Sequence, residues 1–162
     1  MAARRTPTLG TLLRHLVDTL DGAVEQAYAR SGLDYRPRYT PVMRALLDLG
    51  PVSIRAISRS AGITHSAVSQ TVSQMAKQGL VSLESGGDAR ERIVALTPAA
   101  EAMIPALERH WAATNAAARA LDEELSTPLS DLLGEAIAAL ERRPFAERID
   151  QAAAKLNSHA KR

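Results

Sequence analysis

Residues 52–81 read VSIRAISRSAGITHSAVSQTVSQMAKQGLV, and this stretch decides the fold. Ser53 can cap a first helix, and Thr64 can cap a second helix that ends at Gly79. Isoleucine and valine recur at three- and four-residue spacing in the two helices, which is typical of buried helix faces. The short turn between them contains Gly62. Two helices joined by such a turn predict a helix-turn-helix.

Two short strands and a polar turn are predicted directly after this helix pair. Residues 80–84 (LVSLE) and 92–96 (RIVAL) are rich in leucine and β-branched side chains, and residues 85–88 (SGGD) have the composition of a turn. A hairpin at this place is the wing of a winged helix-turn-helix. The expected fold is therefore mainly α, with a small hairpin.

Long amphipathic helices are predicted on both sides of this module. A stripe of apolar residues runs from Leu9 to Tyr28 with three- and four-residue spacing. Thr40 and Pro41 suit the N-cap and the first turn of a short helix that stops at Gly50.

Three further helices are predicted after the hairpin. Thr97 and Pro98 open a long one, and Pro105 inside it predicts a kink or a later start. Thr127 starts another helix that ends at Pro144, and a last helix precedes a charged tail. The apolar stripes of the helices at both ends exceed what one chain of this size needs for its own core. They predict that the long N- and C-terminal helices are dimerisation helices.

The composition excludes several classes of protein. The chain has 162 residues, the size of one domain, and only 3% of them are aromatic, too few for the base-stacking platform of an RNA-binding sheet. It has no cysteine, which excludes disulfides, cysteine zinc sites and thiol-based sensing. No apolar run approaches the roughly 18 residues of a membrane span, and no signal peptide is evident. We therefore expect a cytoplasmic protein without membrane contact.

The acidic residues are unevenly distributed along the chain. Residues 1–99 contain 12 Lys or Arg and 8 Asp or Glu, whereas residues 100–162 contain 8 and 10. The stretch from Pro51 to Leu83 has no acidic residue but includes Arg55, Arg59 and Lys77. Such a surface is suited to the phosphates of a nucleic acid, and a chance gap between acidic residues is the alternative.

The helix pair, followed by GGDARERIVALTPAA at residues 86–100, resembles the winged helix-turn-helix of the MarR family of bacterial transcriptional regulators. The resemblance covers about residues 39–100 in motif detail and the flanking helices in kind. It implies a sequence-specific regulator that binds double-stranded DNA as a homodimer. The expected segments are an N-terminal dimerisation helix and loop (1–38), a winged helix-turn-helix DNA-binding domain (39–98) and C-terminal dimerisation helices (99–162).

The second helix of the pair is expected to enter the major groove of DNA. Ser66, Ser69 and Gln70 are the candidates for reading base edges, because serine bonds several bases and glutamine pairs with adenine. Gln74 lies on the same predicted face, and many family members have Arg at the position of Gln70. A merely solvated face is the alternative, although such a face normally includes Asp or Glu. The candidate DNA-binding residues are Thr64, His65, Ser66, Ser69, Gln70, Ser73, Arg90, Arg92, Arg55, Arg59 and Lys77.

The resemblance also assigns roles in the wing. Arg90 matches the arginine that in the family reaches from the wing tip into the minor groove, where the negative potential attracts it. Asp88 would brace the wing. Arg92, Arg55, Arg59 and Lys77 are candidate phosphate contacts, which position the protein without reading sequence. A solvated surface is the alternative for each of them.

Many members of the family are released from DNA by a small ligand that binds where the DNA-binding module meets the dimerisation helices. The polar aromatic side chains in the corresponding segments include Tyr35 and His110. The candidate effector-binding residues are His15, Tyr28, Tyr39 and Trp111. Ordinary packing is the alternative role for each.

No enzyme activity, cofactor or metal is expected. The four histidines have no metal-ligand spacing, and no phosphate-binding loop or nucleophile motif is present. One alternative is a winged-helix dimer that acts as a protein–protein adaptor or antirepressor without binding DNA, and the acid-free stretch argues against it. Another is an enzyme that uses a pocket between helices, and the lack of converging acid, base and nucleophile argues against that.

Overall fold

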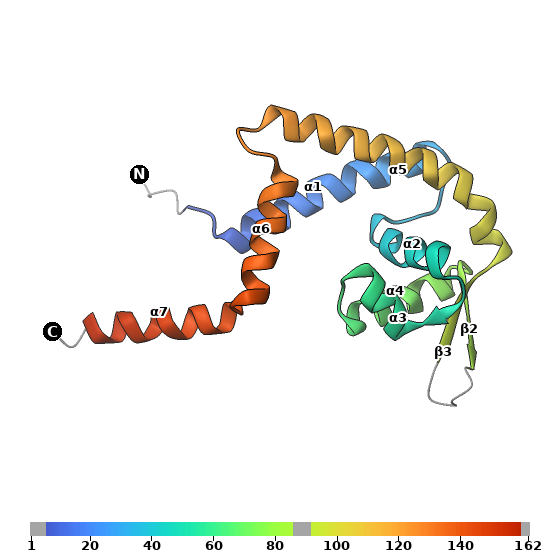
Figure 1. Cartoon of the computed structure of the whole chain (residues 1–162). Coiled ribbons are helices and arrows are strands. Elements are labelled where there is room, and N and C mark those ends of the chain that lie inside the picture. The colour runs from blue at the N-terminus through green and yellow to red at the C-terminus, as the bar shows by residue number, and fades with distance from the viewer. Residues whose placement is uncertain (1–5, 86–91, 160–162) are drawn as a thin grey trace. The chain divides into compact units, whose positions relative to one another are not determined.

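The computed structural model describes residues 6–85 and 92–159, and the chain forms two compact units, Met1–Ala112 and Ala113–Arg162 (Figure 1). The first unit holds most of the secondary-structure elements and ends inside α5. Its elements are α1 (Leu9–Arg30), the 3-10 helix η1 (Pro37–Tyr39), α2 (Thr40–Leu49), β1 (Val52–Ser53), α3 (Ile54–Ala61), α4 (His65–Lys77), β2 (Val81–Ser85), β3 (Arg92–Leu96) and the first part of α5 (Pro98–Glu124).

The strands form one small antiparallel sheet in the order β1-β3-β2. Strands β2 and β3 pair as the hairpin that the sequence predicts for the wing, with Val81 opposite Leu96. On the other side of β3, Val52 of β1 lies opposite Val94. The predicted fold class, a mainly helical winged helix-turn-helix, is confirmed.

The core of the first unit lies between α2, α3, α4 and the sheet, which contact one another (Figure 1). Val68, Val72 and Met75 of α4 are buried there, together with Ile57 of α3 and Val94 of β3. The inward sides of the helices are those that the apolar spacing predicts. This packing fixes which side of α4 remains exposed.

Three predicted helix starts can be compared with the structure. Ser53 caps α3 and Thr97 caps α5, as expected. Thr40 is not the N-cap of α2, because η1 runs directly into α2 and makes Tyr39 the cap residue, with no side-chain cap bond. Helix α5 begins at Pro98 and continues through Pro105, so a later start is not observed.

The second unit comprises the rest of α5, α6 (Leu129–Arg142) and α7 (Phe145–His159). The Asp122 carboxylate accepts hydrogen bonds from the Ser130 hydroxyl at 2.5 Å and from the backbone N–H groups of Leu129, at 2.8 Å, and Ser130. These bonds join the end of α5 to the start of α6 and hold the pKa of Asp122 below its ordinary value. No helix within residues 6–85 and 92–159 is long and apolar enough to cross a membrane.

Candidate nucleic-acid interface

The turn between α3 and α4 is held by local hydrogen bonds. Helix α3 ends at Ala61, and Gly62 is its C-cap residue. The φ of Gly62 is +66°, a left-handed value that favours glycine. The Ser58 hydroxyl donates to the carbonyl of Ile63 at 2.6 Å, and the Thr64 hydroxyl accepts from the N–H of Ala67 at 3.3 Å. These bonds fix the direction in which α4 leaves the turn.

The outward side of α4 is polar and carries no carboxylate. Its inward side is buried, whereas the candidate DNA-binding side chains of the cap and the helix are all exposed. A shallow hollow of about 370 Å³ lies on this side, lined by Ser69, Gln70, Ser73, Gln74 and Lys77. The exposed candidates are Thr64, His65, Ser66, Ser69, Gln70, Ser73 and Lys77. The structure thus brings the predicted base-reading residues onto one continuous side.

The candidate phosphate contacts lie on other elements of the same unit. Arg55 and Arg59 are exposed on α3, and Arg92 is exposed at the start of β3. Arg90 and Asp88, the candidates at the wing tip, lie outside the described residues. Exposure leaves the three described arginines accessible to a polyanion.

Thr97 joins three elements of the module. Its hydroxyl donates to the carbonyl of Gly79 at 2.7 Å and accepts from the N–H of Ala100 at 3.2 Å. Its own N–H donates to the carbonyl of Leu80 at 3.1 Å. Gly79 follows the C-terminal end of α4, so Thr97 connects that end with the start of α5. The sequence identified Thr97 only as a helix cap.

A cluster of aromatic rings lies where α1, η1 and α5 come together. Tyr28 stacks edge-on against Tyr35, with ring centroids 5.2 Å apart, and against His110 at 5.1 Å. Tyr35 and Tyr39 form a third edge-on pair at 5.7 Å. Nε2 of His110 lies 2.9 Å from the hydroxyl oxygen of Ser31. We call Tyr28, Tyr35, Tyr39 and His110, together with Trp111, the aromatic cluster.

Two polar atoms of the aromatic cluster are buried without a hydrogen-bond partner in the part of the chain that the structure describes: the hydroxyl of Tyr35 and Nε1 of Trp111. Burial raises the pKa of the Tyr35 phenol, so this group stays neutral. Arg44 lies over the Trp111 ring, 4.9 Å from its centroid, an interaction that the sequence did not reveal. His15 is exposed and lies 13 residues before Tyr28 on α1, about 20 Å along the helix axis, apart from the cluster.

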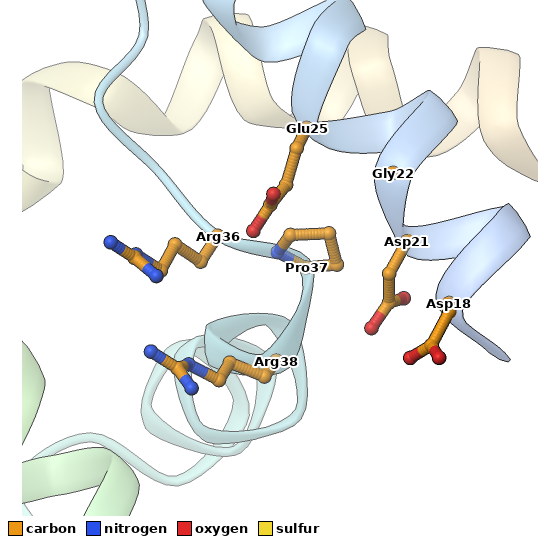
Figure 2. A pocket seen from close by; sticks show the side chains of 7 residues that line it. All are labelled: Asp18, Asp21, Gly22, Glu25, Arg36, Pro37 and Arg38. Carbon is orange, nitrogen blue, oxygen red and sulfur yellow. The ribbon is translucent and has the colours of Figure 1, made fainter. Parts of the chain in front are cut away.

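A second hollow, of about 270 Å³, separates charges of opposite sign (Figure 2). Asp18, Asp21 and Glu25 enter it from α1, and Arg36 and Arg38 come from the segment opposite. No ion pair joins these five residues, all of which the structure describes. Burial, and then the neighbouring Glu25 and Asp18, raise the pKa of Asp21. This hollow has the chemistry of a solvated surface cleft.

The fold and the polar side of α4 define a winged helix-turn-helix protein whose exposed helix has the shape and chemistry for a DNA groove. Residues 31–91, the segment that holds the helix-turn-helix, match the model of the MarR family. The matched family is one of DNA-binding transcriptional regulators. No curated protein sequence matches the chain.

Solved structures with similar folds are known at low sequence identity. The transcriptional regulator MOSR of M. tuberculosis, solved in complex with DNA, is 19% identical, with a TM-score of 0.64 over 85% of this chain and 99% of that one. PcaV of Streptomyces coelicolor, in complex with its natural ligand, is 19% identical, with a TM-score of 0.57 over 86% and 99%. BpsR of Bordetella bronchiseptica, whose DNA binding is regulated by 6-hydroxynicotinic acid, is 22% identical, with a TM-score of 0.51 over 70% and 84%. At these identities the similarity shows the fold alone.

Proposed function

We propose that this regulator binds a pseudo-palindromic operator in duplex DNA as a homodimer, and that it is a repressor released by a small ligand. The single observation that carries the proposal is the exposed side of α4, where hydroxyl and amide side chains gather without a carboxylate. An α-helix fits the major groove, and short polar side chains allow its backbone to approach the base edges.

The roles of individual residues follow from their chemistry. Ser66, Ser69 and Gln70 would read bases, with Thr64, His65 and Ser73 beside them. Arg55, Arg59, Lys77 and Arg92 would contact phosphates and set the register of the protein on the duplex. Arg90 would enter the minor groove, and Asp88 would brace the wing.

The dimer is supported by apolar side chains that one chain leaves uncovered. Leu9, Leu12 and Leu13 of α1 and Leu132, Leu133 and Ile137 of α6 are all exposed. A second copy would bury them and would present a second α4, so that the two helices enter successive major grooves about 34 Å apart. Segments 1–38 and 99–162 would then supply the dimer contacts, and segment 39–98 the DNA contacts.

The ligand would bind at the aromatic cluster. Leaving Trp111 Nε1 buried without a partner is unfavourable, and a ligand with an acceptor group could satisfy this atom. The Tyr35 hydroxyl is a second candidate, although the Thr40 side chain lies near enough to lower its pKa. Tyr28, Tyr39 and Trp111 belong to this cluster, and His15 would take part only through the second copy. PcaV in complex with its natural ligand and the regulation of BpsR by 6-hydroxynicotinic acid support ligand control for a chain of this fold. A regulator of this kind would act in the cytoplasm, where bacterial DNA lies.

Duplex titration at several salt concentrations tests the proposal. We expect the affinity of the purified protein for its operator to fall steeply with salt, because phosphate contacts release counterions. Arg90→Ala should weaken operator binding by about tenfold, whereas Arg109→Ala, an exposed arginine of α5, should not. Failure to bind any duplex would favour the protein–protein adaptor. Trp111 is the single tryptophan, so its fluorescence reports ligand binding at the cluster.

A further inference from the structure

The hollow on the outward side of α4 contains two glutamines one helical turn apart. Gln70 and Gln74 line it together with Ser69, Ser73 and Lys77. Gln70 is exposed, and Gln74 is half-buried, so part of its side chain is already held by the protein. A partly ordered side chain loses less conformational freedom when it binds, which favours a contact through Gln74.

The residue types in this hollow select among the four bases. In the major groove, Arg and Lys pair with guanine, Asp and Glu accept from cytosine, and Asn and Gln pair with adenine through two hydrogen bonds. Helix α4 contains no Arg, Asp or Glu, and its one Lys, Lys77, is the last residue of the helix, which lines the hollow and is assigned to a phosphate contact. Among the remaining residues of the hollow glutamine is the strongest base reader, and its preferred partner is adenine.

We infer that Gln74 is a second base-reading residue and that Gln70 and Gln74 together select a half-site with two A·T pairs. The two residues are four positions apart, about 6 Å along the helix axis at 1.5 Å per residue. Two side chains one helical turn apart on the same side of the helix can therefore contact two different base pairs. Ser69 and Ser73 accept either base and add little discrimination. This inference rests on the proposed binding of duplex DNA.

Selection of duplexes from a random pool by the full-length protein tests the inference. The enriched half-site should contain two A·T pairs at the positions that α4 contacts. Gln74→Ala should reduce the preference at one of these pairs by about tenfold or more and leave the affinity for random duplex unchanged. Gln74→Arg should move the preference at the same pair toward G·C. Gln78→Ala is the matched control, because Gln78 is an exposed glutamine that follows α4 and does not line the hollow.

The possible results separate this inference from the proposed function. A protein that enriches no sequence would overturn both. A protein that enriches a defined half-site with G·C pairs at the positions that α4 contacts would overturn the inference and leave DNA binding intact. The same holds if Gln74→Ala binds the selected site with unchanged preference at every position. Circular dichroism excludes misfolding as the cause of a loss, and alanine favours the helix.

Discussion

The two compact units of the chain differ in what they bury. Every buried side chain among the described residues lies in Met1–Ala112. In the described part of Ala113–Arg162 no residue is buried. Leu121 and Leu129 are partly buried, and the other large apolar side chains are 39% to 72% exposed. The helices of both units have apolar stripes at helical spacing. An amphipathic stripe therefore identifies a face that needs cover without identifying what covers it.

The same contrast occurs within a single helix. At the N-terminal end of α1, Leu9 and Leu12 are more than half exposed, at 66% and 52%. At its C-terminal end, Tyr28 is buried and Val24 packs against the core. One continuous stripe thus contributes to the core at one end and is available to a second copy at the other.

Charging the exposed apolar stripe of α6 should have the largest effect. Leu133→Asp combined with Ile137→Asp should abolish the homodimer, because two copies lose four apolar contacts worth about 1.5–3 kcal/mol each. The dimer dissociation constant should rise by more than about a thousandfold in sedimentation or light scattering. Glu135→Ala, on the opposite side of α6, is the control. A double variant that remains dimeric would show that this stripe is not the interface.

A substitution in the core of the first unit should have the next largest effect. Leu107 of α5 is fully buried, so Leu107→Ala should destabilise the protein by about 2–5 kcal/mol in urea denaturation. Leu140→Ala in α6, tested in the monomeric double variant, should cost less than about 1 kcal/mol, because Leu140 is 43% exposed. Equal costs would mean that the second unit has a core of its own.

The caps of α1 and α5 should differ by a smaller amount. Thr97→Val should cost about 1 kcal/mol for the cap of α5 and about 1 kcal/mol for the bond to Gly79. Thr8→Val should cost only the first of these, because the Thr8 hydroxyl caps α1 without bonding to another element. Thermal unfolding of both variants and of Thr97→Ser measures the difference. Identical losses for the two valine variants would remove the link between α5 and the end of α4.

Two aspartates, one in each unit, should produce small effects of opposite sign with pH. The pKa of Asp21 is raised above its ordinary value of 3.8, so its ionisation destabilises the folded state as the pH rises through the folded pKa. The pKa of Asp122 is lowered, so its contribution is present above the ordinary value and is lost as the pH falls through the folded pKa.

Melting temperatures of Asp21→Asn and Asp122→Asn between about pH 3 and pH 7 test these signs. Relative to the natural chain, Asp21→Asn should gain stability as the pH rises, whereas Asp122→Asn should lose it. Parallel curves for both variants would contradict the assigned environments.

The sequence predicted most helices and the hairpin because their periodicity and caps are local. Strand β1 was missed, since two residues show no periodicity. The Asp122 bonds to the start of α6 were missed because they cross the loop between two helices, where no periodicity relates the partners. On α4 helical spacing identified the exposed side, including Gln74, but the hollow depends on how the side chains lie. The ring contacts of Tyr35 and His110 arise from tertiary packing, which spacing does not contain.

The pairing of β1 with β3 limits where the chain can accept an inserted residue. Ser53 belongs to two structures at once: its backbone pairs with Ile93, and its hydroxyl caps α3 through the N–H of Ala56. An inserted residue between Ser53 and Ile54 would separate the strand from the cap, and one between Val52 and Ser53 would move one of them out of its pairing and turn its side chain to the other face. The segment from Val52 to Ile54 therefore has to keep its length.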